Sequence, residues 1–209
     1  IDLYQLHWPD RRMSMFGADG LGYKHYEAET VPILETLNVL SDLVKSGKIR
    51  YIGLSNETPW GLSEFIKYSE QLDLPRIVSV QNAYNFLNRT YELGMSEFHH
   101  RSQVGLLAYS PLAQGYLSGK YIDGARPAGA RTTLFERGDR YEIPAANEAI
   151  KSYVGYAQSI NMDPSVMANS FVNSRDFVTS NIIGATTMEQ LKLAIGSIDV
   201  KLSEEDLKQ

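Results

Sequence analysis

The sequence has 209 residues, no cysteine, a formal net charge of −5 and 43% hydrophobic residues. The lack of cysteine excludes disulfides and thiolate metal sites, and it favours a reducing, cytoplasmic compartment. The acidic balance argues against a general nucleic-acid surface, and no stretch approaches the ~18 apolar residues of a membrane span. The hydrophobic fraction is sufficient for a sizeable core, and the length suggests one or two domains.

Strand-like apolar runs alternate with helical patterns along the chain. We expect strands at residues 1–6, 49–54, 77–80, 104–108 and 177–183. Helical patterns fall at residues 31–44, 58–71, 92–102, 145–160, 164–173, 187–197 and 203–208. Strands that alternate with helices are typical of βα units and a parallel sheet. The segment 114–144 is rich in Gly, Arg and Pro, and we expect it to be too polar for the core.

Local signals mark several helix boundaries. Thr58 and Asp163 each precede a proline, which predicts that they are N-caps. Gly47 is predicted to end the first helix. Ser203 and Asp206 have the spacing of a weak capping box.

The expected strands end in polar residues or glycine: His7, Ser55-Asn56, Gln81-Asn82, Tyr109-Ser110 and Gly184-Ala185-Thr186. In a parallel barrel the carboxyl ends of the strands carry the chemistry. In a doubly wound sheet, ligands bind in a crevice at the same ends. We therefore expect the functional site along this edge, whichever architecture the sheet adopts.

We expect no metal site. The four histidines include no pair with metal-binding helical spacing: His7, His25, His99 and His100. The pair His99-His100 ends a predicted helix, where a cation suits the helix dipole.

Six stretches, in order, carry a family resemblance: DLYQLHWPD, LVKSGKIRYIGLSN, VQNAYNFLNR, LLAYSPLAQGYLSGKY, FVTSNIIGATTMEQLK and LSEEDL. With them the chain resembles the C-terminal half or more of an aldo-keto reductase, in the subfamily that contains potassium-channel β subunits and bacterial Tas-like reductases. The resemblance implies an α/β fold, the eight-stranded (β/α)8 TIM barrel. The chain would supply strands four to eight, so we expect residues 1–209 to form a single domain, an incomplete barrel whose first three strands lie upstream.

The resemblance implies reduction of an aldehyde or ketone by NADPH, with a tyrosine as proton donor and a lysine, an aspartate and a histidine around it. His7 matches the histidine and would donate a hydrogen bond to the substrate oxygen. The alternative for His7 is a packed core histidine. The tyrosine, lysine and aspartate are expected upstream of Ile1, and none of the thirteen tyrosines is nominated as the donor.

The same resemblance implies an NADP(H) site assembled from several strand ends. Ser55, Asn56 and Gln81 would hold the nicotinamide carboxamide, since their side chains can donate and accept hydrogen bonds, and Tyr109 would stack on the nicotinamide ring. The pyrophosphate would meet the loop Ser110, Pro111, Leu112, Ala113, Gln114 and Gly115, followed by Ser118 and Lys120. Arg131 would lie near the 2′-phosphate. The adenosine phosphate would meet the turn Gly184, Ala185, Thr186, Thr187 and Gln190.

Plainer interpretations stay open for each of these residues. The polar strand ends are also ordinary turn residues, Tyr109 also fits packing at a barrel rim, and Lys120 and Arg131 also fit a charged surface. The chain departs from the family at Leu193 and Ala194, where a polar residue followed by an adenine-binding asparagine is usual. We therefore expect altered adenine contacts.

Two functions remain open at this point. The first is a carbonyl reductase acting on a small aldehyde or ketone. The second is a cofactor-binding regulatory module like the channel β subunits. The loop 9–29 follows His7, and its apolar residues Met13, Met15, Phe16, Tyr23 and Tyr26 would form a lid or an ordinary surface loop. The oligomeric state is left open.

Overall fold

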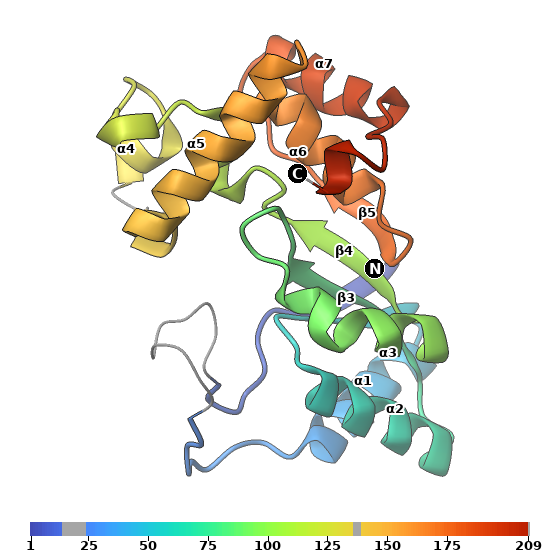
Figure 1. Ribbon diagram of the computed structural model, residues 1–209. Coiled ribbons are helices and arrows are strands. Elements are labelled where there is room, and N and C mark those ends of the chain that lie inside the picture. The colour runs from blue at the N-terminus through green and yellow to red at the C-terminus, as the bar shows by residue number, and fades with distance from the viewer. Residues whose placement is uncertain (14–23, 136–138, 209) are drawn as a thin grey trace. The chain divides into compact units, whose positions relative to one another are not determined.

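The structure is a computed structural model, and it describes residues 1–13, 24–135 and 139–208 (Figure 1). Met15, Phe16 and Tyr23 of the expected lid lie outside the described residues. No helix in the described ranges is long and apolar enough to cross a membrane. The same ranges hold no group of three or more His, Asp or Glu side chains that could bind a metal ion.

The expected strands form one five-stranded sheet. They are β1 (Leu3–Leu6), β2 (Tyr51–Ser55), β3 (Ile77–Ala83), β4 (Gly105–Tyr109) and β5 (Val178–Ile182). The strand order is β1-β2-β3-β4-β5. The β1–β2 and β2–β3 pairs are parallel, with Leu6 opposite Leu54 and Leu54 opposite Val80. Each strand therefore pairs with its neighbours in sequence.

This order distinguishes between the two architectures that the sequence left open. A doubly wound sheet reverses its strand order at a switch point, whereas a (β/α) barrel adds each strand beside the previous one. The sheet has no such reversal. The fold is α/β and matches part of a (β/α)8 barrel, as expected. β3 is longer than predicted and includes Gln81 and Asn82.

The chain divides into two compact units. Unit 1 contains Ile1–Asn82 and Glu92–Leu107, and unit 2 contains Ala83–Tyr91 and Ala108–Gln209. The helices of unit 1 are α1 (Ile33–Lys45), α2 (Pro59–Leu72) and α3 (Met95–Ser102). Its buried apolar side chains come mainly from the strands and from α1 and α2, and they include Leu37, Leu40, Ile52, Leu54, Leu62, Phe65, Ile77, Val80 and Leu106.

The helix boundaries in unit 1 follow the predicted signals with one exception. Gly47 has a φ of 72° just after α1, and Thr58 accepts a hydrogen bond from the Gly61 amide as the N-cap of α2. The helix expected at 92–102 is interrupted at Gly94, so that a 3₁₀ turn, Thr90–Leu93, precedes α3.

Unit 2 is mainly helical around β5. Its elements besides β5 are η2 (Ala113–Ser118), η3 (Ile122–Gly124), α4 (Arg131–Phe135), η4 (Asp139–Tyr141), α5 (Pro144–Ser159), α6 (Pro164–Asn173), α7 (Met188–Gly196), η5 (Ser197–Asp199) and η6 (Asp206–Lys208). The helices α5 and α6, orange in Figure 1, contact each other. Ser203 and Asp206 make the predicted capping-box contacts, but the helix expected there is a short 3₁₀ turn.

The prediction that segment 114–144 is too polar for the core is wrong. Tyr116, Leu117, Tyr121 and Tyr141 are buried in this segment and belong to the core of unit 2. The rings of Tyr116 and Tyr121 lie 4.7 Å apart, and the Tyr121 hydroxyl accepts a hydrogen bond of 3.2 Å from the Thr132 amide. A tyrosine can bury its ring while its hydroxyl finds a polar partner. The polar composition of segment 114–144 therefore did not reveal that its tyrosines belong to the core.

Helix α6 is the most buried helix of unit 2. Phe171 stacks on Tyr84 with ring centroids 5.7 Å apart, and Phe177 meets Tyr84 edge-on at 5.2 Å. Met167 and Val172 are also buried. At its start, Asp163 accepts hydrogen bonds from the amides of Ser165 and Val166, as the sequence predicted. The stability of unit 2 therefore depends on this helix and its cap.

Replacing Asp163 with alanine is expected to destabilise the protein by about 0.5–2 kcal/mol, the usual cost of losing an N-cap. Two amides at the start of α6 would lose their side-chain acceptor. Urea unfolding followed by circular dichroism measures the change. Asp163→Asn is the matched control, because it keeps an acceptor oxygen and should retain most of the stability. Equal losses for both variants would contradict the capping role.

Candidate functional site

His7 lies directly after β1, the edge strand of the sheet, and is exposed in this structure. Its ring centroid lies 5.8 Å from that of Trp8. Its backbone carbonyl accepts a hydrogen bond of 2.9 Å from Nδ2 of Asn56. This bond ties the carboxyl end of β1 to that of β2 and leaves the imidazole outside the core.

Ser55, Asn56 and Gln81 come together with His7 in unit 1. The Ser55 hydroxyl and the Asn56 backbone amide both donate to the Gln81 carbonyl, at 2.7 and 3.0 Å. Ser55 and Asn56 are buried, and Asn56 has a φ of 54°. The side chain of Gln81 donates to Oε1 of Gln5 at 3.0 Å. These residues therefore connect the carboxyl ends of three strands, in addition to any role toward a ligand.

The predicted cofactor residues of unit 2 begin at the end of β4. Tyr109 is half-buried, and burial raises the pKa of its hydroxyl, while the neighbouring Arg140 partly offsets that rise. The carbonyl of Tyr109 accepts a hydrogen bond of 3.2 Å from the Tyr84 amide. Tyr109 therefore ends its strand at a half-buried position, as expected for a stacking residue or a rim residue.

Backbone strain gathers at the predicted cofactor residues. Eight non-glycine residues in the described ranges have positive φ, a conformation that costs roughly 1 kcal/mol or more for an L-residue. Three of these eight lie at helix ends, namely Asp73, Gln103 and Asn161. Four of the other five are predicted cofactor residues: Asn56, Ser110, Ala113 and Gln114.

The loop 110–115 forms a tight turn with short side chains. Gly115 has a φ of 99°, and the Ser118 hydroxyl donates to its carbonyl at 2.7 Å. A Cβ atom at Gly115 would lie 2.9 Å from Cε and 3.1 Å from Nζ of Lys120. The loop therefore holds a glycine where an ammonium group approaches the backbone closely. Small residues beside a cation are well suited to an anionic phosphate.

Arg131 is exposed at the first residue of α4, which fits either a phosphate contact or a charged surface. The turn 184–190 is exposed as well and leads into α7. Gln190 accepts from the amide and hydroxyl of Thr186, and the Gln190 amide donates to the Thr187 hydroxyl at 3.2 Å. Thr186, Thr187 and Gln190 thus form a reciprocal cap, a structural role that the family resemblance did not imply.

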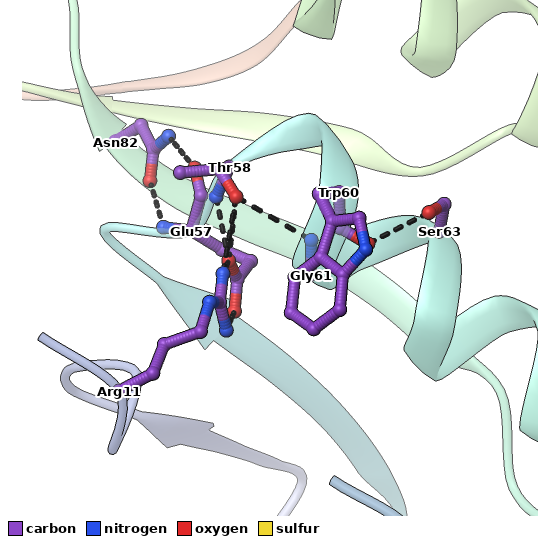
Figure 2. A network of polar contacts seen from close by, with 7 residues as sticks. All are labelled: Arg11, Glu57, Thr58, Trp60, Gly61, Ser63 and Asn82. Atoms are coloured by element: carbon purple, nitrogen blue, oxygen red, sulfur yellow. Dashed lines mark hydrogen bonds and ion pairs between the residues drawn. The ribbon is translucent and has the colours of Figure 1, made fainter. Parts of the chain in front are cut away.

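A polar network that the sequence analysis missed lies beside Asn56 (Figure 2). Glu57 is buried, and its carboxylate pairs with the Arg11 guanidinium. The backbone amide of Glu57 donates to Oδ1 of Asn82 at 3.1 Å, and Nδ2 of Asn82 donates to the Glu57 carbonyl at 2.8 Å. The one sequence signal for this network was Glu57, an acidic residue between the strand end at Asn56 and the helix cap at Thr58.

A cavity of about 480 Å³ lies in unit 2 but contains none of the predicted site residues. Its lining includes Tyr116, Arg126 and Glu142, and Glu142 accepts from both other side chains. Burial and the hydrogen bond to Glu142 raise the pKa of Tyr116 to about 12. Tyr116, Arg126 and Glu142 are thus paired with one another in the cavity wall.

The strand order matches part of a (β/α) barrel, and the polar residues that end the strands lie at the carboxyl edge of the sheet. A family model described as "Aldo/keto reductase family" matches residues 1–209. The chain belongs to the aldo/keto reductase family, a family of oxidoreductases, which confirms the resemblance drawn from the six motifs.

Curated relatives agree with this assignment. The chain is 47% identical over 210 residues to "Protein tas" of Escherichia coli, covering all of this chain and 60% of that protein. It is 37% identical over 204 residues to "Aldo-keto reductase" of Babesia bovis, covering 92% of this chain and 72% of that protein. It is 30% identical to "L-glyceraldehyde 3-phosphate reductase" of Escherichia coli, covering 95% of this chain and 59% of that protein. The chain thus spans about 60% of the length of the Tas relatives that it matches.

Proposed function

We propose that the protein containing this chain is an NADPH-dependent reductase of aldehydes or ketones. The observation that carries the proposal is the positive φ of Asn56, Ser110, Ala113 and Gln114, which are predicted cofactor residues directly after β2 and β4 or in the following η2. Strained backbone persists where the surrounding structure and function require it. The position of His7 at the end of β1 and the membership of the family support the same activity.

The residues present fit a dinucleotide phosphate. Lys120 places an ammonium beside Gly115 in a loop of small residues, and a bound NADPH would supply the hydride. Ser55 and Gln81 would orient the carboxamide, and Lys120 and Arg131 would bind phosphate groups. His7 would hold the substrate carbonyl by a hydrogen bond to its oxygen, which stabilises charge that develops there.

The regulatory module is the less favoured function. The Babesia relative and one Escherichia coli relative are named as reductases, and the family is one of oxidoreductases. Steady NADPH oxidation with a panel of aldehydes would support the enzyme, whereas tight cofactor binding without turnover would support the module. The proposal also includes a small carbonyl compound as substrate, a cytoplasmic location and a single barrel domain to which both units belong.

The protein is expected to bind NADPH more tightly than NADH. Arg131 would contact the 2′-phosphate, which NADPH carries and NADH lacks, and such a charge-assisted contact contributes about 1.5–3 kcal/mol, which is roughly tenfold or more in Kd. Isothermal titration with both cofactors measures the preference. Arg131→Gln should reduce the affinity for NADPH and leave the affinity for NADH unchanged, whereas Arg50→Gln, which removes an exposed arginine paired with Asp2, should change neither affinity. Equal Kd values for the two cofactors would refute the NADPH preference.

A further inference from the structure

The residues after His7 are anchored one by one. Oδ2 of Asp10 accepts a hydrogen bond of 2.6 Å from the Val31 amide. Arg11 pairs with Glu57, and the Arg12 guanidinium lies 4.1 Å from the ring centroid of Tyr26. Three consecutive side chains thus have three different partners. The start of the loop 9–29 is therefore held by Glu57, by Val31 and by Tyr26 near the other end of the same loop.

The Arg11 contact is the most buried of the three (Figure 2). Only 2% of the Glu57 side chain and 22% of the Arg11 side chain are exposed. Nη1 of Arg11 donates to Oε2 of Glu57 at 3.2 Å, and Nη2 donates to Oε1 of Glu57 and to the Thr58 hydroxyl. A bidentate pair of this kind fixes direction as well as distance. Removing one partner leaves a buried charge without compensation, which is costly.

The first turn of α2 packs closely against the Arg11–Glu57 ion pair. The Arg11 guanidinium lies 4.8 Å from the ring centroid of Trp60, in the first turn of α2. A Cβ atom at Gly61 would overlap both the Arg11 guanidinium and the Glu57 carboxylate. The Glu57 carboxylate also accepts from the Thr58 amide at 2.6 Å. The start of α2 thus encloses the Arg11 guanidinium closely.

Two neighbouring residues of the β2 end therefore hold both ends of one short segment. Asn56 binds the His7 carbonyl, and Glu57 binds the Arg11 side chain. Between these two contacts lie Trp8, which is 49% exposed, and Pro9, whose ring restricts the backbone. The segment 7–11 is thus fixed at its first and last residues, and it contains the imidazole of His7.

We propose that the Arg11–Glu57 ion pair is a positioning device that fixes segment 7–11 and thereby sets the affinity for the carbonyl substrate. Arg11 and Glu57 are positioning residues, because they act through Trp8, while Asn56 separately holds the His7 carbonyl. The proposal rests on the proposed reductase function for its kinetic part. Its structural part, the fixing of segment 7–11, is independent of any activity.

The structural part is tested by tryptophan fluorescence. The chain has two tryptophans, Trp8 and Trp60, so Trp60→Phe leaves Trp8 as the single reporter. In that background, Arg11→Ala is expected to raise the acrylamide quenching of Trp8, and Arg11→Lys to raise it less. The matched control is Arg50→Ala, which removes an exposed arginine paired with Asp2 and should leave quenching unchanged. Equal quenching in the Arg11→Ala and Arg50→Ala proteins would overturn the proposal.

The kinetic part is tested in the protein that supplies the whole barrel. Arg11→Ala is expected to raise KM for aldehydes by about tenfold or more, since small displacements in a site have large effects. kcat should change by less than about threefold, as for a loss of binding alone. Arg11→Lys should restore part of the affinity, and Arg50→Ala should change neither constant. An unchanged KM in Arg11→Ala would overturn the proposal.

A third variant keeps the test valid if Arg11→Ala fails to fold. Glu57→Gln preserves the size and two polar atoms of the side chain but removes the charge, so it should give intermediate quenching and an intermediate KM. If Glu57→Gln showed wild-type quenching of Trp8 and a wild-type KM, the proposal that the ion pair fixes segment 7–11 would be overturned. If the unaltered protein turned over no aldehyde, the proposed function would fail, and the quenching experiment would still decide whether the pair fixes segment 7–11.

Discussion

Replacing His7 with alanine, in the protein that supplies the whole barrel, is expected to lower kcat for aldehyde reduction by about 10²–10³-fold. His7 is exposed at the carboxyl end of β1, and Asn56 holds its backbone carbonyl. The imidazole would donate a hydrogen bond to the substrate oxygen, where negative charge develops as hydride arrives. Because that charge is largest in the transition state, the loss should appear in kcat more than in KM.

The control for this prediction is His100→Ala. His100 is exposed in the last turn of α3, and it belongs to none of the predicted catalytic or cofactor residues. Steady-state NADPH oxidation with saturating aldehyde measures both variants, and NADPH binding to the His7 variant should stay close to that of the unaltered protein. A His7 variant with the kcat of the His100 variant would contradict the catalytic assignment.

The strands could be predicted because their signal is local. Runs such as residues 49–54 are short and apolar and end in polar residues, and the observed strand β2 differs by one or two residues at its ends. The caps Thr58 and Asp163 were equally clear, because a small polar residue directly before a proline is typical of the first residues of a helix. The barrel-like strand order, by contrast, was implied only by the family resemblance, because the alternation of strands and helices fits both architectures.

The core role of segment 114–144 could not be predicted from composition. Tyr116, Tyr121 and Tyr141 stand among glycines, arginines and prolines, and no regular period links them. They pack against one another through 3₁₀ turns, which leave no 3.6-residue pattern. The burial of these rings depends on tertiary contacts with α5 and α6, such as those to Ile150 and Ala168.

The Arg11–Glu57 pair was missed for a related reason. The two residues are 46 positions apart, and nothing local to Arg11 distinguishes it from Arg12. The motif match pointed to Asn56 as a cofactor residue, whereas the structure also gives its side chain a hydrogen bond to His7. A family motif therefore marks residues whose structural role becomes visible only when the strands are paired. Residues 55–57 thus include both predicted cofactor residues and the residues that hold segment 7–11.

The 209-residue chain by itself is expected to show no aldehyde-dependent NADPH oxidation. None of its thirteen tyrosines matches the position of the family's proton donor, and losing a positioned general acid typically costs 10²–10⁴-fold. The chain also spans only 60% of the length of the Escherichia coli Tas protein, and a sheet with unpaired edge strands gives the cofactor loops less support. The purified chain is assayed with a panel of aldehydes beside a version extended by the residues that match the rest of the Tas relative. The extended protein should turn over aldehyde and respond to His7→Ala. Turnover by the 209-residue chain that His7→Ala abolishes would show that the proton donor lies within these residues.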